Sequence, residues 1–267
     1  MAGNYRHSKK LSLLNSQEKE IKMLPLIRLT GSIFSAAVLL SACGGGGGGA
    51  APPDPSVAVS QVAPGPQVAS FSLQSGYKSL IANGQNTQFT ISGTCSGTAS
   101  IVTSPATAST FEGSPALSST ETTTANYTNC ALSNMFVPVF SYFDSNYNPL
   151  GSAIAGNSFG KYLLPATQFP SSVKVGDTGD LGTETIFADS TKSVFKGQVG
   201  RSFIIEKDGV SSSTAIVNLI VKRYDSNNQL VTTTQKRYRV IANGSLTSVS
   251  IDVVSATGDI HLIYSAI

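Results

Sequence analysis

The chain has few of the residues on which most metal and acid–base chemistry depends. In 267 residues it contains 2 His, 3 Cys and no Trp. The three cysteines are far apart in the sequence, so none belongs to a Cys-x-x-Cys pair. A zinc site built from histidine and cysteine therefore has almost no candidate ligands. We predict no metal ion and no cofactor.

Charged residues are also scarce. Asp, Glu, Lys and Arg make up 12% of the chain, which is about half the share found in ordinary soluble domains. This composition argues against a coiled coil, a helical bundle rich in Ala, Glu, Lys and Leu, and an acidic disordered chain. The formal net charge of +3 raises the question of nucleic-acid binding, which depends on how the N-terminus is processed.

The N-terminal region has the pattern of an export signal. Residues 29–40 are apolar, too short a stretch for a bilayer span but suited to the hydrophobic region of a signal peptide. The sequence Leu40, Ser41, Ala42, Cys43 follows, and it resembles the lipobox of bacterial lipoproteins. The resemblance implies that residues 1–42 are cleaved and that Cys43 carries lipid. Starting at Met23 gives a signal peptide of ordinary length; alternatively, the preceding residues form a long polar extension.

The residue after Cys43 indicates which of the two bacterial membranes the protein would be anchored to. In enterobacterial lipoproteins an Asp at this position retains the protein in the inner membrane, and here Gly44 takes its place. The resemblance therefore implies a lipid-anchored protein of the outer membrane.

Cleavage would also remove six basic and two acidic residues, leaving 12 basic against 13 acidic residues. A nucleic-acid-binding domain is typically basic, so we expect no nucleic-acid partner.

A tether is expected between the lipid and the folded part. Residues 44–49 are six consecutive glycines, and five prolines lie between positions 52 and 66. Glycine-rich chain is flexible and proline-rich chain is extended, and neither buries enough apolar surface to become ordered. We predict a lipidated, disordered tether over residues 43–67 and a single globular domain over residues 68–267.

The globular region has the pattern of an all-β domain. Short apolar or β-branched runs alternate with turn residues, and no helical periodicity is evident after Leu40. Asp, Ser and Asn at residues 144–146 and again at 225–227 predict two hairpin turns. We predict a single antiparallel β-sandwich or barrel-like domain, with strands at 87–95, 98–103, 118–127, 137–143, 185–188, 201–207, 215–224, 230–241, 247–254 and 260–264.

Two cysteines remain after lipidation of Cys43. Cys95 and Cys130 would both lie in an exported, oxidising environment, which favours a disulfide between them. The alternative is a pair of unrelated buried thiols. We predict the disulfide.

Two short motifs resemble catalytic sequences. Residues 156–160 match the G-x-S-x-G elbow of hydrolases around Ser158, but Pro165 stands where the helix of that motif should run. The only base left for it is His261. Residues 177–179 match the D-T-G of aspartic proteases, which require two such carboxylates, while Asp177 and Asp180 lack the rest of a calcium-binding pattern. We predict no catalytic residue.

Five basic residues are concentrated on one predicted hairpin. They could meet an anionic partner, such as lipopolysaccharide or membrane headgroups. Alternatively, they only keep exposed strands soluble. The members of this patch are Lys222, Arg223, Lys236, Arg237 and Arg239.

The sequence thus predicts a lipid-anchored bacterial envelope protein that acts as a non-catalytic binding or structural module. Its partners are the membrane, reached through acylated Cys43, and an envelope component or anionic surface. One alternative is a periplasmic hydrolase that uses Ser158 or a pair of carboxylates. Another is a carrier that holds a hydrophobic ligand in a β-barrel cavity.

Overall fold

The computed structural model describes residues 69–209, 211 and 213–267. The predicted signal peptide, Cys43 and the tether lie outside these residues. Within the described part, no helix is both long enough and apolar enough to cross a membrane.

The described residues form one helix, α1 (Leu73–Asn83), followed by thirteen strands. The strands are β1 (Gln85–Gly93), β2 (Ser96–Thr103), β3 (Thr107–Phe111), β4 (Ser114–Thr128), β5 (Met135–Phe143), β6 (Pro149–Ile154), β7 (Ser158–Tyr162), β8 (Thr178–Phe187), β9 (Phe195–Lys207), β10 (Thr214–Tyr224), β11 (Leu230–Ile241), β12 (Leu246–Ser255) and β13 (His261–Ala266).

Twelve of these strands close into an antiparallel barrel. From β4 to β13 each strand pairs with the next along the chain, and the last strand then pairs with β1. The ring closes because β2 pairs with both β1 and β4, with Thr98 opposite Asn126 in the second pairing. Of the predicted alternatives, the structure is therefore a barrel and not a sandwich. Strand β3 stands outside the ring and pairs only with β4.

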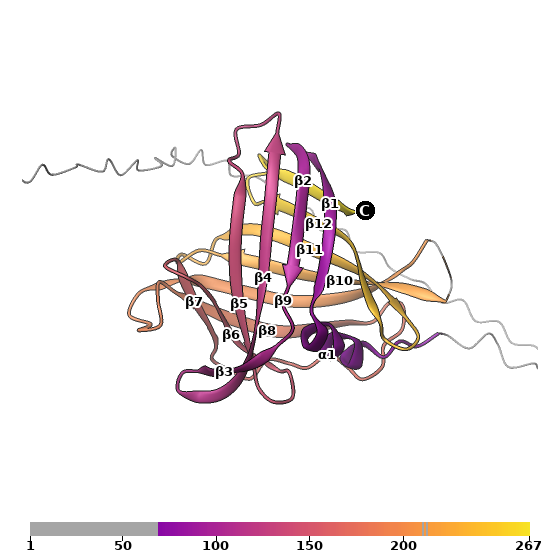
Figure 1. Cartoon of the computed structure of the whole chain (residues 1–267), viewed down its shortest axis with the longest axis horizontal. Coiled ribbons are helices and arrows are strands. Elements are labelled where there is room, and N and C mark those ends of the chain that lie inside the picture. The colour runs from indigo at the N-terminus through magenta and orange to yellow at the C-terminus, as the bar shows by residue number, and fades with distance from the viewer. Residues whose placement is uncertain (1–68, 210, 212) are drawn as a thin grey trace, which may run out of the picture. The chain divides into compact units, whose positions relative to one another are not determined.

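The barrel has two walls that cross each other. Figure 1 shows β1, β2 and β4 running up the front while β9, β10 and β11 cross behind them. Side chains alternate between the two faces of each strand. The outward rows of β1, β2 and β4 are mainly hydroxyl and amide side chains, with the exposed Val102 among them: Asn86, Gln88, Thr90, Thr98, Ser100, Thr120, Thr122, Thr124 and Asn126. The outward row of the neighbouring β5 is apolar, because Phe136, Pro138 and Phe140 stand opposite outward residues of β4.

Two apolar clusters fill parts of the interior. One joins Leu73 of α1 to Phe203, Val217 and Val240 of the back wall. The other lies among β1, β2, β4, β12 and β13, around Phe89 and the buried Cys95. Neither cluster fills the space between α1 and the middle of the strands, which is lined by other side chains.

The end of the barrel beside the first cluster is covered by α1 and residues 163–177, which we call the end plug. Phe71 and Val173 exchange two backbone hydrogen bonds, at 2.8 and 3.0 Å, and so join the two parts of the plug. The helix lies so close to the β11–β12 turn that a Cβ on Gly76 would stand 1.8 Å from the carbonyl oxygen of Gly244. Only glycine permits this approach.

The sequence prediction missed α1. An isolated helix of 11 residues is marginal in water. The Ser72 side chain makes no capping hydrogen bond, and the first turn has no acidic residue. The helix is stabilised instead by burying Leu73 and Ile81 against the barrel.

Both hairpin turns predicted from Asp, Ser and Asn are confirmed. Asp144 Oδ1 accepts backbone hydrogen bonds from Asn146 and Asn148 between β5 and β6. Asp225 Oδ1 accepts the equivalent pair from Asn227 and Gln229 between β10 and β11. The same local chemistry therefore forms two turns in different parts of the sheet.

The predicted disulfide is also present. Cys95, in the β1–β2 turn, is bonded to Cys130, in the β4–β5 loop, with a Cα–Cα distance of 5.2 Å. The bond closes a loop of about 36 residues, which the loop-entropy relation equates with about 3–4 kcal/mol of stabilisation. It ties together two loops that belong to different hairpins of the front wall.

Candidate functional site

A cavity of about 350 Å³ lies inside the barrel beside α1. This volume is at the lower end of the range typical of small-molecule sites. The walls come from α1, the plug residues, the front-wall strands β4 and β5, and the back-wall strands β9, β10 and β11. Much of the lining is apolar: Leu80, Ile81, Val139, Phe143, Phe169, Leu181, Leu219 and Val221.

An ion pair crosses the interior between the two walls. Lys236 on β11 donates to both carboxylate oxygens of Glu121 on β4, at 2.8 and 3.0 Å. Burial disfavours the ammonium and lowers its pKa, but the attraction of Glu121 outweighs this effect. The net result is a pKa for Lys236 above the ordinary lysine value, so this side chain is charged at neutral pH.

A second ion pair lies deeper in the wall. Arg201 Nη1 is 2.7 Å from Glu184 Oε2 and donates to the Tyr162 hydroxyl at 3.0 Å. Ser152 donates to the other carboxylate oxygen of Glu184 at 2.6 Å. Desolvation opposes the charge of Arg201, but the neighbouring Glu184 raises its pKa above the ordinary arginine value. Glu184 is 0% exposed, and Arg201 and Ser152 are the charged and hydrogen-bonding partners of its carboxylate.

A glycine makes room for this buried carboxylate. A Cβ on Gly160 would stand 2.1 Å from Glu184 Oε1 and 2.9 Å from the Ser152 hydroxyl. Gly160 is the last glycine of the G-x-S-x-G motif. In this protein it therefore provides space on the inner face of β7, next to Glu184.

Two tyrosine hydroxyls in the cavity lining have no hydrogen-bond partner among the described residues. Tyr77 on α1 and Tyr238 on β11 form no hydrogen bond with any described residue, although both line the cavity. Burial raises the pKa of Tyr77 to about 12 and also raises that of Tyr238. Both phenols are therefore protonated at neutral pH, and each offers an O–H donor.

The residues of the hydrolase motif are not brought together. Ser158 is on β7 and His261 is on β13, and the strand order places these two strands on opposite sides of the ring. His261 Nε2 lies 2.9 Å from Asp252 Oδ1, on a side chain that is 48% exposed. The structure thus gives Ser158 no contact with the proposed base.

Asp177 and Asp180 stabilise local turns. The Asp177 carboxylate accepts the backbone N–H of Lys174, and the Asp180 carboxylate accepts that of Gly182. In the part of the chain that the structure describes, no group of three or more His, Cys, Asp or Glu side chains is arranged to hold a metal ion.

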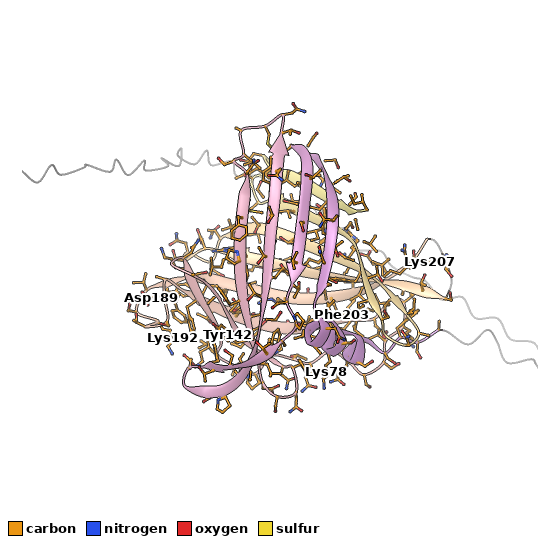
Figure 2. All side chains as sticks on the ribbon, in the orientation of Figure 1. Lys78, Tyr142, Asp189, Lys192, Phe203 and Lys207 are labelled. Atoms are coloured by element: carbon orange, nitrogen blue, oxygen red, sulfur yellow. A yellow bond between two sulfur atoms is a disulfide. The ribbon has the colours of Figure 1, made fainter. Side chains whose placement is uncertain are left out.

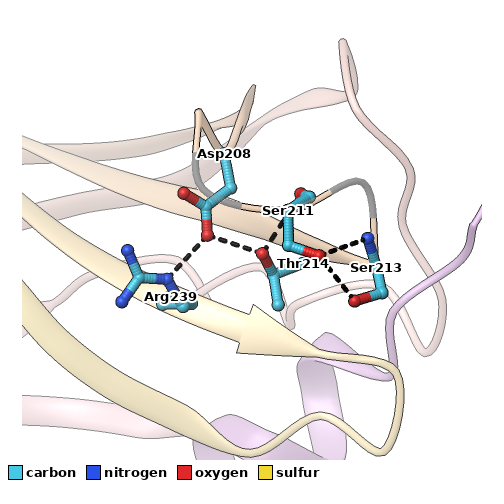
Figure 3. Close-up of polar contacts among 5 residues, drawn as sticks. All are labelled: Asp208, Ser211, Ser213, Thr214 and Arg239. Atoms are coloured by element: carbon cyan, nitrogen blue, oxygen red, sulfur yellow. Dashed lines mark hydrogen bonds and ion pairs between the residues drawn. The ribbon is translucent and has the colours of Figure 1, made fainter.

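The five basic residues predicted as a patch are divided between the two faces of the sheet. Lys236 points into the barrel and pairs with Glu121. Arg237 lies 3.4 Å from Glu206 on the outer face. Arg239 Nε lies 2.6 Å from Asp208 Oδ2, and Figure 3 shows this ion pair as a dashed line. No ion pair of Lys222 or Arg223 is found among the described residues.

Sequence reasoning identified Lys236 but missed its inward direction, and it missed the rest of the cavity. Thr234, Lys236 and Tyr238 stand at alternate positions of β11 and all line the cavity. Because β11 has polar residues on both faces, its pattern does not show which face is internal. Glu184 and Arg201 lie on different strands, and nothing in the sequence marks them as a pair.

The buried ion pair should stabilise the fold far more than a surface one. We expect Glu184→Gln to lower the free energy of unfolding by about 3 kcal/mol, because it leaves the Arg201 charge uncompensated. The matched control is Glu112→Gln. Glu112 pairs with Lys161 and Lys192 at the surface, so we expect its loss to cost at most about 1 kcal/mol. Denaturant unfolding measures both, and equal losses would contradict this assignment.

Comparisons with known proteins assign no relative to this chain. No protein-family model, no curated protein and no solved structure matches it. Its function is therefore inferred from the chain's own residues, and the cavity lined by Tyr77, Tyr238, Arg201 and Lys236 is the feature that carries the inference.

Proposed function

We propose that this protein is a lipid-anchored binding module of the bacterial envelope, which holds a small amphipathic molecule inside its barrel. The observation that carries the proposal is the cavity beside α1. It combines an apolar lining with two hydroxyls, of Tyr77 and Tyr238, that no described residue satisfies. Hydroxyl donors that line a cavity without a partner among the described residues are available to a ligand or to water.

Binding is better supported than catalysis. A hydrolase needs a nucleophile within hydrogen-bond reach of a base. Ser158 and His261 lie on opposite sides of the barrel, and the Glu121 carboxylate is bonded to Lys236 through both oxygens. The Glu121–Lys236 ion pair holds charge at a fixed place in the cavity, which suits recognition of a ligand.

The lipid anchor is supported by the lipobox ending at Cys43 and by the glycine- and proline-rich residues that follow. Two or three acyl chains hold a protein stably on a bilayer, whereas one holds it only marginally. The outer rows of β1, β2 and β4 are mainly polar, which suits a domain that stands in water beside the membrane. Gly44 favours the outer membrane as the location.

Filling the cavity should abolish binding. The chain has no Trp, so Thr234→Trp introduces a single large side chain, and a fluorescent reporter, on the inner face of β11. We expect the unaltered chain to bind the neutral amphipathic dye N-phenylnaphthylamine, and Thr234→Trp to bind it at least about tenfold more weakly, equivalent to about 1.4 kcal/mol.

The matched control is Thr233→Trp, the same substitution one residue away on the outer face of β11. It should leave dye affinity unchanged. Thermal unfolding of both variants, followed by circular dichroism, checks that each is folded. Equal dye binding by the two folded variants, or no binding by the unaltered chain, would rule out an internal site.

Removing the anchor should release the protein from the membrane. We expect Cys43→Ser to abolish metabolic labelling with palmitate and to move the protein from the membrane fraction to the aqueous fraction, because the acyl chains supply the attachment. Persistence of both the label and the membrane association in this variant would show that the lipobox assignment is incorrect.

A further inference from the structure

The charged side chains that line the cavity are mostly basic. Lys78, Arg201 and Lys236 contribute positive charge, and Glu121 is the one acidic residue among the described lining residues. Figure 2 shows Lys78 on α1, at the lower end of the barrel. The second carboxylate, Glu184, lies behind Arg201 and does not line the cavity. The lining therefore has an excess of positive charge, although the chain beyond residue 42 is nearly neutral.

Arg201 keeps donors free for a ligand. Its contacts with Glu184 and with the Tyr162 hydroxyl both use Nη1. A guanidinium carries five N–H donors, so those on Nη2 and Nε have no partner among the described residues. The side chains of Arg201 and Lys236 are 31% and 25% exposed, although both line the cavity. The two cations are thus paired with glutamate but still accessible.

The free tyrosine hydroxyls belong to residues that line the same cavity as these cations. Tyr238 stands two residues from Lys236 on the inner face of β11, and Tyr77 enters the cavity from α1. Because Tyr77 and Tyr238 are protonated at neutral pH, their O–H groups add to the donors of Arg201 and Lys236. Donors of this kind suit a carboxylate, which has two oxygens and accepts several charge-assisted hydrogen bonds.

We propose that the ligand is an amphipathic carboxylate, an organic acid with an apolar body. Its carboxylate binds between Arg201, Lys236 and the hydroxyls of Tyr77 and Tyr238. Its body packs on the hydrocarbon surface of Ile81, Val139, Phe143, Leu219 and Val221. This inference rests on the proposed binding function and adds the chemical class of the ligand.

Glu121 then competes with the ligand. In the structure it occupies Lys236 through both carboxylate oxygens, at 2.8 and 3.0 Å. A bound carboxylate takes over part of the Lys236 charge and also feels the repulsion of Glu121. Neutralising Glu121 should therefore strengthen the binding of an anion, weaken that of a cation and leave a neutral molecule almost unaffected.

The test compares three probes that share one hydrocarbon chain: decanoate, decanol and decylamine. The protein is the full-length chain with Cys43→Ser, kept free of detergent, and binding is measured by isothermal titration calorimetry at neutral pH. We expect decanoate to bind at least about tenfold more tightly than decanol. A tenfold difference in affinity is the effect of one charge-assisted hydrogen bond. Decylamine should bind most weakly of the three.

Variants of the lining separate the head-group contacts from the apolar ones. Tyr77→Phe combined with Tyr238→Phe removes both hydroxyls and keeps both rings. We expect it to weaken decanoate about tenfold and to leave decanol unchanged. Glu121→Gln should tighten decanoate severalfold, whereas Glu112→Gln, the same change on the outer surface, should have no effect on any probe.

The possible outcomes distinguish the ligand class from the binding function. If decanol or decylamine binds as tightly as decanoate, or if Glu121→Gln weakens decanoate, the carboxylate assignment is overturned and the binding function stands. If none of the three probes binds but N-phenylnaphthylamine does, the carboxylate assignment is again overturned and the binding function stands. If no probe and no dye binds, the binding function itself fails. If a variant does not fold, the order of the affinities for the three probes, measured on the chain with an unaltered barrel, still tests the carboxylate assignment.

Discussion

Closure of twelve strands into one ring is the constraint on which the rest of the structure depends. About eight strands enclose an interior that side chains can fill, and a wider ring leaves space. In this barrel α1 and residues 163–177 occupy one end, with Leu73, Phe169 and Val173 in the apolar cluster there. A second cluster forms beside the Cys95–Cys130 disulfide. The cavity is the part of the interior that neither cluster fills.

The charged residues inside the barrel say more about the function of the interior than the apolar residues do. Buried ion pairs add little net stability compared with apolar residues of similar size, because taking charges out of water is costly. Glu184 with Arg201, and Glu121 with Lys236, are therefore poor choices for merely filling space. They make sense if the interior must present charge and donors to something that enters it. The Glu121–Lys236 pair also connects strands distant in sequence, since β4 and β11 stand on opposite walls.

The sequence was a good guide to the strands and a poor one to the interior. Strand β12 was identified because Val249, Ile251 and Val253 alternate with polar residues, and β10 because residues 216–221 form a nearly continuous apolar run. Strands β3, β6 and β7 have only five or six residues each, with Gly, Ser and Ala among them, so their pattern is weak. Asp144 and Asp225 were identifiable because an Asp turn is local chemistry.

The functional residues could not be found in this way. Whether Lys236 points inward depends on ring closure between β2 and β4, a contact between distant segments. Tyr77 enters the site only because α1 folds against the barrel, and that helix is stabilised by packing and not by its own propensity. The Cys95–Cys130 pairing was deducible because counting the cysteines left one choice once Cys43 was assigned to lipid.

The most direct test of an occupied cavity is the native mass spectrum of the Cys43→Ser chain, produced in its native cells and purified without detergent. We expect a population heavier than the protein alone by the mass of one small molecule, and we expect that molecule, once released, to be acidic. The heavier population should be missing from Thr234→Trp and present in Thr233→Trp. A single species at the mass of the protein alone, in all three proteins, would contradict the account.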